Sequence, residues 1–468
     1  MVDLRTGVAM VEVPAGLARL AEFPFALLTF TEESGYPVSV AVDVAVEADR
    51  GRLSFAPPAG LAVPLGREIS LTGSHINPRP GYGYDERRHV TVWGRAQQAP
   101  DGRLVLRAEA AWGWDEATIP FPEYVERTVG QSQRYLARLS AEVGRTVRPR
   151  LSFGWLFLRA TRLPFLSATF IPVSIGIAIA AAQGFFDLPT AMLTLVGAAA
   201  VHLGLNVAND VFDTRLGADD KNVNPTQYSG GSRVIQYGLV SLRRMTVMSV
   251  SFYAIALAIG AVLLLMRGSV ALLVIGVLGV VLSVGYTAPP LKLVYRGLGE
   301  ITTAIGFGPL MLLGAYVVQT QGLLTPEPVV ASLPIAILVA LILYVNEVPD
   351  RPADARAGKR TLPVRLPRQI VINLYVIAVA AAFLIIVGGV LAGLLPIPAA
   401  AALLAVPLAR RVYDGLEQYY ESPYGLMAVM AVNVKLHMVV GALLLVAYLV
   451  VIAVSALALD LPLFLRWR

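Results

Sequence analysis

Long uncharged runs fill the chain beyond Leu163, whereas the residues before it mix apolar and charged positions throughout. Most of these runs come near the ~20 residues that a helix needs to cross the hydrocarbon core of a bilayer. The run from 369 to 409 is too long for one crossing, and Pro396 and Pro398 divide it. The pattern predicts nine membrane-spanning helices, at residues 164–183, 188–208, 245–266, 269–288, 301–322, 328–346, 369–393, 396–409 and 437–459.

The N-terminal part shows a different pattern, because apolar and polar side chains alternate with the period of two that β-strands produce. Strands are predicted at residues 25–30, 38–42, 52–55 and 89–95. Turn residues lie at Glu32–Gly35 and Asp101–Gly102, and an amphipathic helix is predicted from Glu123 to Val143. The sequence therefore predicts a soluble β domain at 1–150 and an all-α multi-pass membrane bundle at 151–468.

Composition also favours a membrane protein, since 56% of the 468 residues are hydrophobic and 15% are charged, against about 25% charged in an average soluble chain. The chain has no cysteine, which excludes disulfides, thiolate metal sites and cysteine nucleophiles. The net charge of +6 does not indicate nucleic-acid binding, because the basic residues mostly flank the apolar runs. The start of the chain lacks the basic and apolar pattern of a signal peptide, so we expect the β domain in the cytoplasm.

The distribution of lysine and arginine predicts the orientation of the bundle, because cytoplasmic loops carry an excess of both. The loops after the even-numbered spans are rich in them, and so is the segment before the first span, which includes Arg159 and Arg162. The opposite side has little beyond Arg267, Arg466 and Arg468. We therefore expect the basic loops to face the cytoplasm from the inner membrane.

Two groups of acidic and amide residues lie where apolar runs end on this predicted cytoplasmic side. The first contains Asn209, Asp210, Asp213 and Asp219, and the second contains Asn346, Asp350 and Asp354. Spacings of four residues place side-chain oxygens of each group on one helical face. Carboxylates at the mouth of a membrane span are unfavourable unless they are paired, solvated or bound to a metal. Because Mg²⁺ takes oxygen ligands and usually keeps a phosphate partner, these groups are candidate magnesium sites, with solvated helix ends as the alternative.

Basic residues follow in the same loops. The candidates for phosphate contacts are Arg215, Arg233, Lys292, Arg296, Lys359 and Arg360. Gly230 and Gly231 can expose backbone N–H groups to an anion, although a glycine pair is also common in a simple turn. Lys292 and Arg296 lie four apart and can reach one phosphate, or act as ordinary positive-inside anchors. Together with the two carboxylate faces, these lysine and arginine side chains predict a site for a diphosphate that is held through Mg²⁺. The apolar bundle around this site would accept the hydrocarbon tail of the same ligand.

Residues 160–460 resemble the UbiA superfamily of membrane prenyltransferases. The resemblance rests on Asn209-Asp210-x-x-Asp213 and on Asn346-x-x-x-Asp350-x-x-x-Asp354-x-x-x-Gly358-Lys-Arg-Thr-Leu362. It implies nine helices around a cavity and Mg²⁺-dependent transfer of a polyprenyl group from a polyprenyl diphosphate. It also implies that the catalytic residues that hold the metals are Asn209, Asp213, Asp350 and Asp354.

Within this superfamily, Gly217 stands where many members have a third aspartate, with Asp219 two residues further on. This departure resembles the 1,4-dihydroxy-2-naphthoate polyprenyltransferase branch, which makes the menaquinone precursor. The resemblance implies an aromatic acceptor whose ring attacks the allylic carbon and loses its carboxylate. Two features differ from that branch: Glu347-Val-Pro349 replaces the usual Asn-Ile/Leu-Arg, and Pro352 is expected to interrupt the helix of the second motif. A different aromatic acceptor, or a glycerol phosphate, therefore stays open.

Residues 20–140 resemble the pyridoxamine phosphate oxidase-like split barrel, a flavin-binding superfamily, through the phrases that begin at Gly35, Ile69 and Val90. The resemblance implies FMN, with Arg67 as the candidate phosphate contact. The sequence around Arg67 lacks the usual Ser-x-Lys phosphate pattern of that superfamily. A non-catalytic docking or regulatory barrel is therefore the alternative.

Two other classes of function match parts of the pattern. A cation-coupled transporter would use membrane carboxylates for a permeating ion, but would place them near the midplane rather than beside lysine and arginine at one face. A membrane-tethered split-barrel flavoprotein would leave the loop motifs without a role. His202 and His437 fall inside predicted spans, and we expect packed, hydrogen-bonded histidines there rather than acid–base groups.

Overall fold

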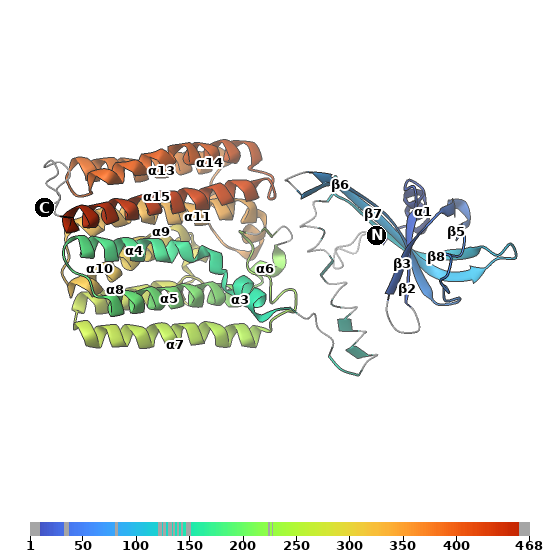
Figure 1. The fold of residues 1–468 in the computed structure, drawn as a ribbon, viewed down its shortest axis with the longest axis horizontal. Coiled ribbons are helices and arrows are strands. Elements are labelled where there is room, and N and C mark those ends of the chain that lie inside the picture. Colours follow the sequence, from blue (N-terminus) through green and yellow to red (C-terminus); the bar gives the residue numbers. More distant parts are fainter. Residues whose placement is uncertain are drawn as a thin grey trace. The chain divides into compact units, whose positions relative to one another are not determined.

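The computed structural model describes residues 10–31, 37–79, 83–119, 151–222, 225–226 and 228–457, together with isolated positions between 124 and 146. The chain divides into two compact units, Met1–Thr146 and Val147–Arg468 (Figure 1). The first unit is built on a β-sheet and the second is a bundle of helices.

The N-terminal unit is a curled antiparallel sheet with the strand order β3-β2-β6-β7-β8-β5-β4, and β1 pairs with β8 (Figure 1). Its strands are β1 (Met10–Val11), β2 (Ala26–Thr31), β3 (Pro37–Val42), β4 (Val44–Glu47), β5 (Arg52–Phe55), β6 (Glu68–Arg79), β7 (Gly83–Gln98) and β8 (Leu104–Asp115). Helix α1 (Val13–Leu20) packs on β7 and β8. Leu17 on this helix joins Phe30, Phe55 and Val92 in one hydrophobic core.

Each of the four predicted strands overlaps an observed strand, because the alternating apolar positions point into this core. The strand predicted at 89–95 is the middle of β7, which pairs with β6 on one side and β8 on the other. The predicted turn at Asp101–Gly102 joins β7 to β8, and Gly102 there has a φ of +83°. The predicted turn at 32–35 and most of the helix predicted at 123–143 lie outside the described residues.

The membrane unit is a bundle whose long helices lie side by side (Figure 1). They are α4 (Ser167–Ala182), α5 (Leu188–Arg215), α7 (Leu242–Arg267), α8 (Val270–Gly285), α10 (Met311–Thr320), α11 (Pro326–Ala357), α13 (Arg368–Leu391), α14 (Val406–Tyr419) and α15 (Leu426–Ala456). Shorter elements are α3 (Phe153–Thr161), η2 (Leu163–Leu166), α6 (Ala218–Lys221), η3 (Leu293–Arg296), α9 (Gly299–Ile305), η4 (Gly306–Leu310), α12 (Leu362–Arg365) and η5 (Ile397–Ala405).

All nine predicted spans fall on helical segments of the described residues. One of them combines α9, η4 and α10, and another combines η5 and α14. Seven helices in the described part of the chain are long and apolar enough to cross a membrane, and α8 is a shorter apolar helix. The chain is therefore a multi-pass membrane protein with an α-helical bundle that follows a β unit.

Helix α11 differs from the expectation at its C-terminal end. The prediction that Pro352 interrupts the second motif was wrong, because α11 continues through Pro349 and Pro352. A proline inside a helix leaves the carbonyl four residues earlier without its helical donor, here at Val345 and Val348. Packing of α11 against α9, α13 and α15 stabilises the segment in spite of this loss. The continuous helix keeps the oxygens of the second acidic group on one side.

Candidate functional site

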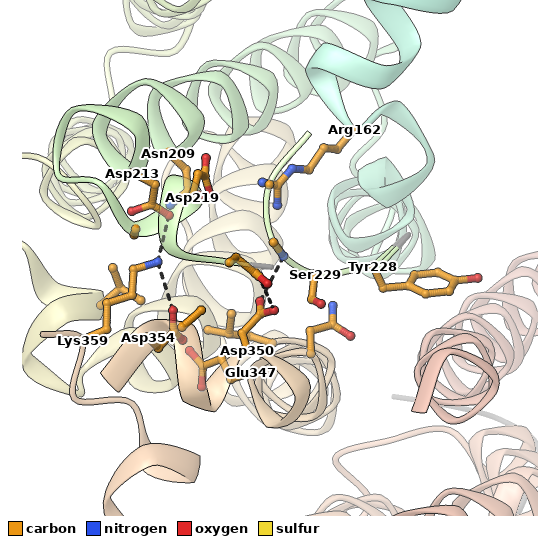
Figure 2. Close-up of a pocket in the computed structure, with 18 of the residues that line it drawn as sticks. Arg162, Asn209, Asp213, Asp219, Tyr228, Ser229, Glu347, Asp350, Asp354 and Lys359 are labelled. Atoms are coloured by element: carbon orange, nitrogen blue, oxygen red, sulfur yellow. Dashed lines mark hydrogen bonds and ion pairs between the residues drawn. The ribbon is translucent and has the colours of Figure 1, made fainter. Parts of the chain in front are cut away.

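The two acidic groups meet at one end of the bundle. Helix α5 extends to Arg215, beyond the predicted end of its span at 208, so its last turns carry Asn209 and Asp213. The last turns of α11 carry the second group, and α6 carries Asp219. These side chains surround a polar cavity of about 110 Å³ (Figure 2). Its charged and amide lining consists of Arg162, Asn209, Asp213, Asp219, Asn222, Asn346, Glu347, Asp350, Asp354 and Lys359.

Lys359 connects the two acidic groups. Its Nζ lies 2.8 Å from Asp213 Oδ2 and 3.7 Å from Asp354 Oδ1 (Figure 2). The Tyr295 hydroxyl donates to the other oxygen of Asp213 at 2.7 Å. Burial acts to lower the pKa of Lys359, but Asp213 and Asp354 outweigh burial and hold that pKa well above its ordinary range. The ammonium group therefore stays protonated and neutralises carboxylates from both helices.

The loop that contains Gly230 and Gly231 closes over Asp350. The backbone N–H of Gly230 donates to Asp350 Oδ2 at 3.0 Å, and Asn222 Nδ2 donates to Oδ1 at 2.9 Å. Gly230 has a φ of +77°, and a Cβ at this position would lie 2.7 Å from Asn222 Nδ2. The sequence predicted that the N–H of Gly230 could bind a phosphate. In the structure this N–H instead binds a carboxylate of the protein.

Asp210 lies beside the cavity without lining it. Its Oδ1 accepts from Arg162 Nη2 at 2.5 Å, and its Oδ2 accepts from the backbone N–H of Ser232 at 3.1 Å. Arg162 does line the cavity, although the sequence indicated it only as one of the basic residues before the first span. The packing of the segment around α3 on α5 creates this pair, and no local pattern reveals it. The sequence also did not indicate Tyr295 and Asn222 as site residues, because their contacts with Asp213 and Asp350 likewise depend on the packing of separate segments.

Several oxygens of the cavity suit a hard cation. Asp219 Oδ2 and Asn346 Oδ1 are buried and accept no hydrogen bond. Burial, and after it Asp213 and Asp210, raise the pKa of Asp219 well above its usual range, because together they outweigh the positive charges of Lys359 and Arg162. Such oxygen donors are the ligands that Mg²⁺ prefers. Within the described residues no three carboxylate or imidazole groups are gathered closely enough to hold a metal, so amide oxygens or a bound ligand must complete any coordination.

The basic residues predicted to bind phosphate are distributed unevenly around this cavity. Among those six, Lys359 is the one that lines it. Arg233 is buried and donates to the backbone carbonyl of Asp219. Arg296 donates to the carbonyl of Pro290 at 3.1 Å. The three that also lie outside the lining are Arg215, Lys292 and Arg360.

A second, apolar cavity of about 550 Å³ lies between α5, α7, α8 and α10. Tyr286 lines both this cavity and the acidic one, and it is the one residue common to the two linings in the described part of the chain. His202 also lies in the apolar wall, where its Nδ1 is 2.7 Å from Thr169 Oγ1 and its ring contacts Phe307 edge-on. The expectation of a packed, hydrogen-bonded histidine is confirmed for His202, and His437 is fully buried.

The N-terminal unit places Arg67 on its surface, in the turn before β6. Aromatic side chains gather on β7 and β8 of the same unit. Trp114 stacks on Tyr124 with ring centroids 4.7 Å apart, and His89 meets Tyr124 edge-on at 5.6 Å. This cluster stabilises one face of the sheet.

Comparison with known proteins identifies relatives of the membrane unit. A sequence profile described as the UbiA prenyltransferase family matches residues 169–433. A 2-carboxy-1,4-naphthoquinone phytyltransferase of Synechocystis is 29% identical over 302 residues, which cover 63% of this chain and 92% of the relative. A 1,4-dihydroxy-2-naphthoate octaprenyltransferase of Bacillus subtilis is 25% identical over 307 residues, or 66% of this chain and 96% of the relative. A solved UbiA homologue from Aeropyrum pernix aligns with a TM-score of 0.47 at 19% identity, covering 59% of this chain and 97% of that chain.

Proposed function

The chain belongs to the UbiA prenyltransferase family, and on that premise we propose that it transfers a polyprenyl group from a polyprenyl diphosphate to 1,4-dihydroxy-2-naphthoate. The product would serve the biosynthesis of menaquinone- or phylloquinone-type quinones. The names of the Synechocystis and Bacillus relatives support this acceptor. The observation that carries the proposal is the junction at Tyr286, where a polar cavity between two acidic helices meets an apolar cavity.

We assign the polar cavity to the diphosphate and its Mg²⁺. The proposed metal ligands are Asn209, Asp213, Asp219, Asn346, Asp350 and Asp354. When bound, Mg²⁺ would neutralise the diphosphate and stabilise it as a leaving group. We assign Asp210 to a different task, the orientation of Arg162, because Asp210 does not line the cavity and its Oδ1 accepts a hydrogen bond from Arg162.

We assign the contacts with the diphosphate to Lys359 and Arg162, since both line the cavity. Lys359 would exchange part of its contact with the carboxylates for one with phosphate oxygens. Arg162 is held by Asp210 and presents a planar guanidinium that suits phosphate geometry. The remaining basic residues would raise the local concentration of the anionic donor or stabilise the loops. They are Arg215, Arg233, Lys292, Arg296 and Arg360.

The apolar cavity would hold the start of the prenyl chain. Its lining is almost entirely aliphatic, with Leu205, Leu263 and Ile275 among the side chains that face it. A prenyl chain that lies in the apolar cavity, with its diphosphate in the polar cavity, passes Tyr286. Its allylic carbon C1 would therefore lie near the ring of Tyr286. The walls exclude water from that carbon, which protects an allylic cation from hydrolysis.

The reaction balances without a nucleophile from the protein. The ring carbon of the acceptor that bears the carboxylate attacks C1, and a carbon–carbon bond forms. The bond from C1 to the diphosphate oxygen breaks, and its electron pair leaves with the diphosphate. The ring then loses its carboxylate as CO₂, whose electrons restore the aromatic system. The hydroxyl groups of the acceptor already activate the ring, so no Ser/His/Asp set is needed.

We propose that the acidic end of the bundle faces the cytoplasm from the inner membrane, because the loops at that end carry most of the lysine and arginine. We also propose that the N-terminal unit is a docking or regulatory barrel. Arg67, the candidate contact for FMN, is exposed in a turn, which suits solvent contact better than an enclosed phosphate. Purified full-length protein should therefore be colourless, and a stoichiometric flavin spectrum would contradict this assignment.

The proposed function is tested by incubating purified protein in lipid nanodiscs with Mg²⁺, an octaprenyl diphosphate and 1,4-dihydroxy-2-naphthoate. We expect a prenylated, decarboxylated naphthoquinol by mass spectrometry, with one diphosphate released per product. Activity with a phenolic acid or a glycerol phosphate, and none with the naphthoate, would overturn the acceptor assignment while leaving prenyl transfer in place.

A further inference from the structure

Glu347 is a buried carboxyl group for which the metal and diphosphate assignments have no role. It lies on α11 in the turn before Asp350 and lines the polar cavity (Figure 2). The residue is 5% exposed. Apart from the neighbouring carboxyl group of Glu300, no group of the described residues bonds either of its carboxyl oxygens. Burial of a polar group without a hydrogen-bond partner is unfavourable, and a bound ligand can supply the partner that this side chain lacks.

Asp213 and Asp350, which line the same cavity, differ from Glu347 in this respect. Asp213 is bonded by Tyr295 and Lys359, and Asp350 is bonded by Asn222 and a backbone N–H. Lys359 is the nearby cation, but it is committed to Asp213 at 2.8 Å. Glu347 is therefore a carboxyl group of the cavity wall that no lysine, arginine or backbone N–H of the described residues bonds.

Two acidic side chains are neighbours of Glu347. Glu300 lies beside it, and Asp354 is also close enough to repel a charge on it. Glu300 is itself held, since its Oε1 accepts from the backbone N–H of Leu362 at 3.2 Å. A phosphate or carboxylate group of a ligand would be repelled here, whereas a neutral hydroxyl group can donate a hydrogen bond to Glu347.

Glu347 also lies close to the junction of the two cavities. It shares the cavity wall with Leu343 and Tyr286, and it lies near enough to Tyr286 for the two side chains to interact electrostatically. Tyr286 marks the junction with the apolar cavity, where the allylic carbon is expected. A ring that attacks this carbon must lie within reach of the same wall.

We propose that Glu347 binds a ring hydroxyl group of the aromatic acceptor and thereby determines which acceptor is used and how it is oriented. The proposal rests on the proposed prenyl transfer and specifies its acceptor subsite. The hydroxyl group donates to a carboxyl oxygen of Glu347, and the carboxylate of the acceptor points away from Glu300. The enzyme would accordingly select acceptors for a hydroxyl group in this position.

The test compares Glu347→Leu and Glu347→Gln with wild type in the transfer assay, with KM measured separately for donor and acceptor. The matched control is Glu327→Gln, because Glu327 lies on the same helix, is also 5% exposed, and bonds Gln183 at the opposite end of α11. We expect Glu347→Leu to raise the acceptor KM about tenfold, the effect of losing one buried hydrogen bond worth about 1.4 kcal/mol. The donor KM should stay within about twofold, and the control should match wild type.

A second comparison uses the two monomethyl ethers of the dihydroxynaphthoate. Wild type should discriminate against the ether that blocks the bound hydroxyl group, and Glu347→Gln, which folds with a side chain of the same shape, should lose much of that discrimination. An unchanged acceptor KM in Glu347→Leu, or an equal preference for both ethers in wild type, would overturn the inference. In both cases wild-type prenylation of the unmodified naphthoate would leave the proposed function standing.

Discussion

The ammonium group of Lys359 contacts the carboxylate of Asp213 at 2.8 Å, although the two residues lie 146 positions apart in the chain. The contact joins the acidic end of α5 to the loop that follows α11. A buried lysine between carboxylates from two helices holds the two motifs at the separation in which a diphosphate and its metals can lie between them.

Replacement of Lys359 by methionine should reduce kcat/KM about 100-fold, because the loss of one partner of a buried ion pair costs about 3 kcal/mol. The effect should fall on donor binding and on the chemical step, since the same side chain is assigned to the diphosphate. Lys221→Met is the control: Lys221 is exposed on α6 and donates to the carbonyl of Arg356. Steady-state kinetics that show equal activity in both variants would contradict the assignment.

Tyr295→Phe should lower kcat/KM about tenfold, because a hydrogen bond to a charged group is worth about 1.5–3 kcal/mol. The hydroxyl group of Tyr295 fixes one oxygen of Asp213 and leaves the other for Lys359. Tyr419, which is 39% exposed, provides the matched Tyr→Phe control. A Tyr295→Phe enzyme with wild-type kinetics would show that the orientation of Asp213 does not depend on this contact.

The affinity for Mg²⁺ should rise with pH. Burial raises the pKa of Asp219 above its usual range, so the carboxyl group holds a proton at pH values where an exposed aspartate is ionised. Metal binding requires the carboxylate, so it releases this proton, and affinity increases as pH rises towards the raised pKa. Calorimetry in buffers of different ionisation enthalpy measures the release. Asp219→Asn should reduce it, whereas the exposed neighbour Asp220→Asn should not; proton release that is unchanged in Asp219→Asn would assign it to another group.

Gly230→Ala should impair the site far more than Gly217→Ala. Both glycines have a positive φ, +77° and +71°, so both substitutions carry a backbone strain of about 1 kcal/mol. A Cβ at Gly230 meets the side chain of Asn222, whereas a Cβ at Gly217 meets nothing within 4 Å. Only the first substitution displaces the N–H that binds Asp350, so we expect about a tenfold or greater loss of donor affinity. Similar donor affinities in the two variants, from titration with a non-reactive donor analogue, would disprove the role of this loop.

Much of the fold could be predicted from the sequence, because it depends on patterns that are local. Apolar runs of membrane length marked all nine helical segments, and alternation marked the strands of the first unit. The prediction for Pro352 failed because the break that a proline favours is a local tendency. Packing of α11 on three neighbouring helices overrides it.

The site was predicted less completely. Spacings of four placed Asn209 with Asp213 and Asp350 with Asp354 on shared faces, and all four line the cavity. The partnership of Arg162 with Asp210 depends on how separate helices pack, as do the contacts of Tyr295. The bonds that occupy Asp210 likewise appear only once Ser232 lies against it. Motif spacing predicts which residues share one helix face. Which of the lysine and arginine side chains line the cavity depends on how the helices pack in the assembled bundle.

The central claim, that both acidic groups form one site for Mg²⁺ and the diphosphate, is tested most directly by titrating the protein in nanodiscs with a non-reactive polyprenyl diphosphate analogue. We predict tight binding by wild type with Mg²⁺, weak binding with a chelator, and loss of the Mg²⁺-dependent part in both Asp213→Ala and Asp350→Ala. If either variant bound the analogue as wild type does in Mg²⁺, the two groups would not form a single site, and the account would be wrong.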